Sequence, residues 1–367
     1  MRTFFAESRI AQPIKKLDFV ILNEFPIFGM ENWGLIFLDQ SFLLKNEPIE
    51  QFNLISHEVV HQWIGNLVTN RNWSQLCIQE GLAEYMTRKL VEDAISKGEL
   101  LGMSSKRLEF YSTERYLRAM NIETKNSQNG RKAIIQDYRT FDQAGDFCFG
   151  KSPLIFLSVE KVLGSKNFKK RLNAFVENFA YKNFDIHDLV GYFDDSESTN
   201  IEKFMKYEMI HGAFRIVNVY KNQTFWTLTP SVFDLPIPVQ IRYLANQNNE
   251  SYIIRNTTQI SAPHRHKDDL IIVNAAAEHF YRVNYDLATW HRLSIYMKNW
   301  SDSLGILSLA KLLNDYCFFY GRFKNDSVLN GILLREMKEN MAVILKNFHE
   351  ASNFVFQNSF NCHAIKQ

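Results

Sequence analysis

A multidomain α+β protein is predicted from the way the hydrophobic period changes along the chain. Apolar residues recur at helical spacing through much of residues 48–211. Short β-rich runs follow between residues 216 and 286, and the helical period then returns. We therefore expect three domains, namely a mostly helical domain over residues 1–215, a small all-β sandwich over 216–287 and the start of an α-helical domain over 288–367.

Two short strands and two long helices are predicted in the first domain. The strands flank the turn-like segment Asn23–Pro26. The helices are expected from Pro48 to Leu67 and from Ser74 to Ser96, because apolar residues share one face of each. These residues are Phe52, Ile55, Val59 and Trp63 in the first helix, and Leu76, Leu82, Met86 and Leu90 in the second.

Six short runs rich in β-branched and aromatic residues predict the second domain. They are separated by turn residues at regular spacing, as in a sandwich of short strands. From about Ala288 the period is helical again, and a second C-terminal helix is expected from about Val328 to Phe348. One face of the first C-terminal helix carries Leu309, Leu312, Leu313 and Tyr316.

Charge and composition exclude several classes of partner. The 367-residue chain has a formal net charge of +2 and no long Lys/Arg run, which argues against nucleic acid as a partner. No uninterrupted apolar stretch approaches the roughly 20 residues of a membrane-spanning helix, and the N-terminus lacks an apolar core of signal-peptide length. The four cysteines form no C-x-x-C pair, so we expect buried reduced thiols rather than a zinc knuckle at Cys77, Cys148, Cys317 and Cys362.

One short motif points to metal chemistry. In His57-Glu58-Val59-Val60-His61, the two imidazoles are one helical turn apart and can reach the same zinc ion. Glu58 can take a proton from a water held by that ion without being a ligand itself. Glu80 lies on the next predicted helix and offers a third ligand, and Gly81 beside it allows a close backbone approach. Two surface histidines on an amphipathic helix are the simpler alternative, which Glu80 makes less attractive.

The segment HEVVHQWIGNLVTNRNWSQLCIQEGLAEYM resembles the zinc-binding stretch of the M1 (gluzincin) aminopeptidases, a family that includes aminopeptidase N. Upstream, Gly29-Met30-Glu31-Asn32 is similar to the exopeptidase motif of that family, and downstream Tyr281–Asp286 resembles a recurrent stretch of its β-sandwich domain. The resemblance runs in the same order from about Lys16 to the start of the C-terminal helices. It implies a thermolysin-like catalytic domain, a β-sandwich and a partial helical domain.

The resemblance also implies roles for individual residues. His57, His61 and Glu80 would hold one Zn²⁺ per chain, and Glu58 would activate water. The motif Gly29, Met30, Glu31 and Asn32 would bind substrate, with Glu31 pairing with the free α-ammonium of a peptide. Relative to the family, the chain is expected to lack the N-terminal β-domain and most of the C-terminal helical domain.

The sequence departs from the family pattern at a position that matters for catalysis. The family uses a tyrosine hydroxyl to stabilise the oxyanion, but the matching segment Phe149–Pro153 has Phe149 at that position. Loss of one oxyanion donor typically lowers the rate roughly 100- to 1000-fold. The benign explanation is a local misalignment, with nearby Tyr138 as the donor. Smaller departures are Phe28-Gly29 where the family has Gly-Ala, Gln79 where it has asparagine, and Gln75 and Cys77 where it has aspartate and tryptophan.

Three functional hypotheses follow. The first is a zinc aminopeptidase acting on peptides with a free N-terminus, which the complete zinc shell and Glu58 favour. The second is a zinc-binding pseudopeptidase that captures peptide N-termini, which Phe149 favours. The third is an interaction module that keeps only the fold, and the intact zinc motif argues against it. Glu31 favours an exopeptidase over an endopeptidase.

Overall fold

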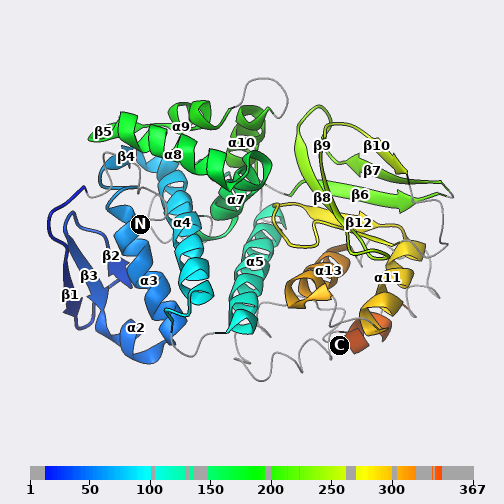
Figure 1. Cartoon of the computed structure of the whole chain (residues 1–367), viewed down its shortest axis with the longest axis horizontal. Coiled ribbons are helices and arrows are strands. Elements are labelled where there is room, and N and C mark those ends of the chain that lie inside the picture. The colour runs from blue at the N-terminus through cyan, green and yellow to red at the C-terminus, as the bar shows by residue number, and fades with distance from the viewer. Residues whose placement is uncertain are drawn as a thin grey trace. The chain divides into compact units, whose positions relative to one another are not determined.

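The chain folds into two compact units, each with helices and small β-sheets (Figure 1). Unit 1 comprises Met1–Leu108 and Lys132–Gly212, and unit 2 comprises Glu109–Arg131 and Ala213–Gln367. The mixed α+β class is confirmed. The computed structural model describes residues 13–100, 104–128, 133–135, 148–194, 200–212, 214–222, 224–261, 270–299, 304–319, 333 and 335–340.

Unit 1 begins with a three-stranded sheet in the order β1-β3-β2. Strands β1 (Asp18–Leu22) and β3 (Leu35–Asp39) are parallel, whereas β2 (Gly29–Met30) is antiparallel to β3. Only two strands were expected, because the two-residue β2 is too short to produce an alternating pattern in the sequence. This short strand places the start of the exopeptidase-like motif at the edge of the sheet.

Two long helices lie side by side in unit 1 and run in opposite directions (Figure 1). They are α3 (Pro48–His61) and α4 (Leu76–Ser96). Helix α3 starts at a proline, which is favourable at the first helical position. It ends six residues earlier than expected, because the chain then turns back so that the Asn66 N–H donates to the His61 carbonyl at 3.0 Å. A short 3₁₀ helix, η1 (Trp73–Gln75), precedes α4.

The buried face of α3 differs from the predicted one. The expected apolar positions Phe52, Ile55 and Val59 are only half-buried, whereas the fourth, Trp63, is buried just beyond the end of the helix. The face turned inward instead carries polar residues, among them His57, Glu58 and His61. Burial of polar side chains is costly unless they find partners, so this face of α3 indicates a site rather than an ordinary core.

Further helices and a small parallel sheet complete unit 1. Strands β4 (Val68–Asn70) and β5 (Lys182–Phe184) pair in parallel. The apolar core includes Ile78, Phe156, Phe175 and Leu189, all fully buried. The remaining elements are α2 (Gln40–Lys45), α7 (Lys151–Leu163), α8 (Ser165–Phe179), α9 (Ile186–Phe193) and α10 (Ile201–Ile210).

A disulfide joins Cys77 at the start of α4 to Cys148 just before α7. The expectation of reduced thiols at these positions was therefore wrong. The two residues are 71 positions apart in the sequence, a separation that gives no local pattern from which the pairing could be inferred. Cys317 is also disulfide-bonded, and Cys362 lies outside the described residues.

Unit 2 contains two antiparallel-rich sheets and helices. One sheet has the order β10-β7-β6-β12 and the other β11-β8-β9. The Tyr285 hydroxyl of β12 accepts a hydrogen bond at 2.9 Å from the Val273 N–H of β11, which connects the two sheets. The strands are β6 (Ile216–Lys221), β7 (Phe225–Pro230), β8 (Ile237–Tyr243), β9 (Asn249–Ile254), β10 (Thr258–Ser261), β11 (Ile271–Val273) and β12 (Arg282–Tyr285).

Among the described residues, unit 2 includes the helices α11 (Leu287–Asn299) and α13 (Ile306–Phe319) and most of α5 (Ser105–Gln128), which begins in unit 1. The expected apolar face of α13 is confirmed, since Leu309, Leu312, Leu313 and Tyr316 are all buried. Of the helix expected at Val328–Phe348, only residue 333 and residues 335–340 are described, and they are helical. Across the described part of the chain, no helix is both long enough and apolar enough to cross a membrane.

Candidate metal centre

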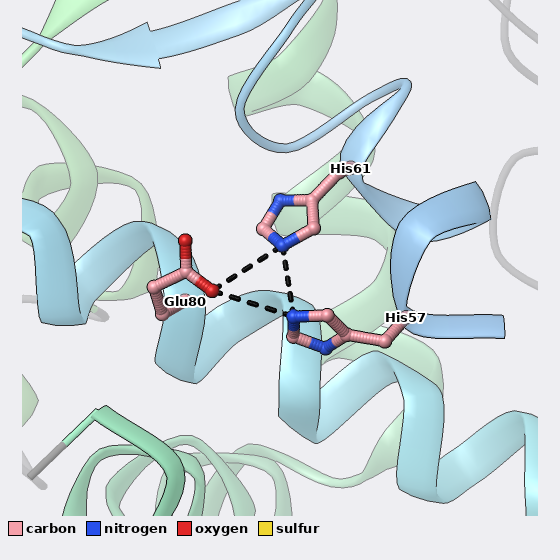
Figure 2. Close-up of side chains that lie close together, drawn as sticks. All are labelled: His57, His61 and Glu80. Carbon is pink, nitrogen blue, oxygen red and sulfur yellow. Dashed lines mark hydrogen bonds and ion pairs between the residues drawn. The ribbon is translucent and has the colours of Figure 1, made fainter. Parts of the chain in front are cut away.

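Three side chains from α3 and α4 converge on one point (Figure 2). His57 and His61 extend from the same face of α3, with their Nε2 atoms 2.9 Å apart. Glu80 extends from α4, and its Oε2 atom lies 3.3 Å from each of these nitrogens. The structure thus brings together the three residues that the sequence suggested as zinc ligands.

The donor set fits a tetrahedral zinc ion. Two ligand atoms that each bind zinc at about 2 Å lie roughly 3.3 Å apart at a tetrahedral angle. The separations of 2.9, 3.3 and 3.3 Å between the three ligand atoms are close to this value. Two imidazoles and one carboxylate with a fourth position left open are typical of catalytic rather than structural zinc.

The ring of His61 is held by a backbone carbonyl. Its Nδ1 atom donates to the Ile64 carbonyl at 2.8 Å, which leaves the Nε2 lone pair facing His57 and Glu80. The Nδ1 atom of His57 faces a carboxylate instead, since Glu84 Oε2 lies 3.6 Å away. Both imidazoles therefore present Nε2 to the centre.

Charge at the site favours a divalent cation. Glu58, Glu80 and Glu84 are buried, with 4%, 4% and 2% of their surface exposed, and the guanidinium of Arg88 is the cation paired with this group. These carboxylates, with Glu31 nearby, outnumber the single guanidinium, so the site would stabilise a divalent cation such as Zn²⁺. Buried charges are stable only when they are paired or bound to metal.

In the metal-free site, the excess of carboxylates raises the pKa values of both histidines. Burial opposes protonation of His61, but the Glu80 carboxylate outweighs it and raises the pKa of His61 to about 9. Burial likewise opposes protonation of His57, yet the carboxylates of Glu80, Glu84 and Glu58 raise its pKa well above the ordinary value. Protons therefore supply the positive charge that the carboxylates require when metal is absent.

Glu58 lies beside the three converging side chains without joining them. Its side chain packs against Gly29 of β2, where a β-carbon would be 2.3 Å from Oε1. Burial raises the pKa of Glu58 to about 7, although the neighbouring histidines oppose this rise. A carboxylate with a pKa near neutrality is suited to proton transfer.

The exopeptidase-like motif is attached to the C-terminal end of α3. The Glu31 carbonyl accepts hydrogen bonds from Gln62 Nε2 at 3.1 Å and from Asn66 Nδ2 at 2.5 Å. The Gly34 N–H donates to Gln62 Oε1 at 2.9 Å. The Glu31 carboxylate contributes to the electrostatic environment of Glu58 and His61, which places it near the same centre. Met30 pairs with β3, and Asn32 is exposed.

Phe149 lies against the candidate metal ligand His57. Its ring centroid is 5.5 Å from that of His57, in an edge-on arrangement. Its carbonyl accepts a hydrogen bond from Arg88 Nη2 at 3.1 Å. The structure thus places an aromatic ring without a hydroxyl beside the site, and the alternative donor Tyr138 lies outside the described residues.

Residues 3–207, more than half of the 367-residue chain, match the peptidase family M1 domain. The chain belongs to peptidase family M1. Its relatives include Tricorn protease-interacting factor F2 of Thermoplasma acidophilum, 26% identical over 89% of this chain and 42% of the relative. Aminopeptidase N of Rattus norvegicus is 23% identical over 85% of this chain and 35% of the relative. Alanine/arginine aminopeptidase of Saccharomyces cerevisiae is 26% identical over 62% of this chain and 27% of the relative.

The chain spans less than half the length of these M1 relatives. Within the M1 domain, the structure also identifies residues that the sequence analysis had not considered. Gln62 and Asn66 hold the Glu31 loop, and Glu84 and Arg88 lie behind His57. The spacing of Glu80, Glu84 and Arg88 along α4, four residues at each step, is the signal that could have revealed the second pair.

Proposed function

We propose that this M1 protein is a zinc metalloaminopeptidase that removes N-terminal residues from peptides. The observation that carries the proposal is the convergence of His57 Nε2, His61 Nε2 and Glu80 Oε2 within hydrogen-bonding distance of one another. The family assignment and relatives named as aminopeptidases support it. Because the chain spans only part of those relatives, its activity is our inference from the site.

Each functional side chain has a distinct task in this proposal. His57, His61 and Glu80 would hold the zinc ion, which would supply a Lewis acid for the scissile carbonyl. Glu58 takes the proton from the attacking water and passes it to the leaving amine, a task suited to a buried carboxylate beside the ligands. Seating against Gly29 holds its carboxylate beside the ligands rather than among them.

Glu31 determines which end of a peptide is cleaved. Its carboxylate pairs with the α-ammonium of the substrate, and a peptide without that charge leaves the carboxylate unpaired. The backbone of Glu31 is fixed by Gln62 and Asn66, which follow directly after the helix of the zinc ligands. The amine-binding group is therefore positioned from the same helix end as the metal, which sets the distance from the N-terminus to the reacting bond.

A zinc-binding pseudopeptidase is the second candidate, and Phe149 is the observation that favours it. The ring lies beside His57 and has no hydroxyl to donate to a developing oxyanion. Loss of such a donor lowers the rate by about 100- to 1000-fold in other enzymes. Such a chain would capture peptide N-termini through zinc and Glu31 but hydrolyse the peptides slowly.

Release of a fluorophore from aminoacyl substrates tests the proposal. The native chain, Glu58→Gln and Phe149→Tyr are compared at equal, verified zinc content. We expect zinc-dependent turnover by the native chain, its loss in Glu58→Gln and a gain in Phe149→Tyr. Turnover by Phe149→Tyr alone would establish the pseudopeptidase instead. Absence of turnover from all three proteins, each with zinc bound, would contradict the aminopeptidase proposal for this chain.

A further inference from the structure

A buried carboxylate lies directly behind one candidate metal ligand. Glu84 is one helical turn after Glu80 on α4 and has 2% of its surface exposed. Its Oε2 atom lies 3.6 Å from His57 Nδ1, on the side of the ring opposite the metal-facing Nε2. Burial of a carboxylate costs several kcal/mol unless it is paired, so its position calls for a compensating interaction.

Arg88 provides that interaction and connects Glu84 to Phe149. The Arg88 Nε atom donates to Glu84 Oε1 at 3.3 Å, across one turn of α4. Its Nη2 atom donates to the Phe149 carbonyl at 3.1 Å, and the Phe149 ring contacts the His57 ring. Each of the four residues His57, Glu84, Arg88 and Phe149 therefore contacts the next, and Phe149 contacts His57 again.

In the described part of the chain, the His57 ring lacks a hydrogen-bond partner on the side that faces Glu84. Its Nδ1 atom is buried and makes no hydrogen bond to any described residue. His61, in contrast, donates its Nδ1 proton to the Ile64 carbonyl at 2.8 Å. The separation between His57 Nδ1 and Glu84 Oε2 exceeds hydrogen-bond distance by only a small margin. Glu84 is thus the acceptor toward which the remaining N–H is directed.

We propose that Glu84, held in place by Arg88, is a positioning residue for the metal ligand His57. It accepts the Nδ1 proton and thereby fixes the tautomer and the orientation in which the Nε2 lone pair faces the metal. Loss of such a partner typically weakens metal binding by roughly 10- to 100-fold. The inference rests on the proposed zinc centre, but it concerns a residue that is neither a ligand nor in contact with substrate.

Zinc affinity of the metal-stripped full chain tests this role, measured by competition with a chromophoric chelator. Glu84→Gln keeps the shape of the side chain and removes its charge. Glu92→Gln is the matched control, because Glu92 lies on the same helix with 42% of its side chain exposed and pairs with Lys89. We expect zinc binding to weaken by about 10- to 100-fold in Glu84→Gln and to stay at the native value in Glu92→Gln.

The absorption spectrum of bound Co²⁺ provides a readout that a merely structural role would not change. Its visible bands should shift in Glu84→Gln, because a neutral amide holds the His57 ring more weakly than a carboxylate does, and match the native bands in Glu92→Gln. If Glu84→Gln fails to fold, Glu84→Asp takes its place. That variant keeps the charge but moves it away from His57, and we expect about a 10-fold loss of affinity.

The possible outcomes are distinguishable. Native zinc affinity and native Co²⁺ bands in Glu84→Gln, or in Glu84→Asp where the first variant does not fold, would overturn the positioning role while leaving the zinc centre intact. No zinc binding by the native chain would overturn the zinc centre itself, and the role of Glu84 with it. Weaker binding confined to the Glu84 variants supports the inference.

Discussion

Helix α4, which carries Glu80, packs tightly against α7 at Gly81, so Gly81→Ala is a direct test of how the centre is built. A β-carbon at position 81 would lie 2.0 Å from Ser152 Oγ and 2.3 Å from Ser152 Cβ. Real β-carbon contacts are essentially never shorter than 3.0 Å, so α4 and α7 must separate by at least about 0.7 Å at Ser152 Cβ. Rotation of the hydroxyl alone does not relieve the contact with Ser152 Cβ, and it breaks the 2.7 Å hydrogen bond that Ser152 donates to the Cys77 carbonyl.

Two costs set the magnitude of the effect. Overpacking of a tight interface typically costs about 1–3 kcal/mol, and loss of the Ser152 hydrogen bond adds roughly 1 kcal/mol. We therefore expect Gly81→Ala to lower the free energy of unfolding by about 2–4 kcal/mol. Because Glu80 is the adjacent residue, zinc binding should weaken as well.

Urea unfolding of the metal-free chain and zinc titration measure these two effects. Gly191→Ala is the matched control, since Gly191 lies in α9 and a β-carbon there meets no atom within 4 Å. The control should gain about 0.5–1 kcal/mol from helix propensity. Combining Gly81→Ala with Ser152→Gly should recover part of the lost free energy of unfolding, because the smaller residue at position 152 makes room for the new methyl group. The two substitutions should therefore be coupled favourably. A stability within 0.5 kcal/mol of native, with native zinc affinity, would refute this packing argument.

Three further predictions concern pH, the disulfide and a buried ion pair. Protonated His61, with its pKa raised from 6.5 to about 9, stabilises the metal-free fold below pH 6.5, and this stabilisation of about 3 kcal/mol is lost as the pH rises toward 9. Thermal unfolding of the zinc-loaded chain should lack this decline, and an equal decline with zinc bound would contradict the ligand assignment. Replacing Cys77 and Cys148 together with serine should lower the free energy of unfolding by about 2–4 kcal/mol, because their bridge closes a long loop; an unchanged melting temperature would oppose this. The buried Glu208 carboxylate lies 3.3 Å from Lys151 Nζ, and Lys151→Met removes that cation. Denaturation should then show a free energy of unfolding lower by about 3–5 kcal/mol. A native value would show that the pair contributes nothing to stability.

Local spacing was sufficient to predict the candidate ligands. His57 and His61 share a helical face at any position in any fold, because the spacing of four residues matches one helical turn. Glu80 required one further assumption, that the next helix returns alongside the first, and α4 does so. The family assignment, the mixed α+β class and the buried face of α13 likewise followed from motifs and periodicity.

Features that depend on long-range packing were not predictable. The Cys77–Cys148 disulfide joins residues far apart in the chain, and nothing in the local sequence of either residue indicates its partner. The inward face of α3 was misassigned, because a metal site buries polar residues where hydrophobicity alone favours apolar ones. The pairing of Glu84 with His57 depends on how α4 packs against α3, because the spacing from Glu80 shows only that both glutamates share one face of α4.

Zinc content measured by plasma mass spectrometry, together with protein concentration, tests the central claim most directly. The native chain, His61→Ala and Glu58→Gln are each loaded with zinc and freed of excess metal by gel filtration. We expect one zinc per chain in the native protein, its loss in His61→Ala and its retention in Glu58→Gln, because Glu58 lies beside the ligands and is not one of them. Full zinc content in His61→Ala, or none in the native chain, would contradict the zinc centre proposed at His57, His61 and Glu80.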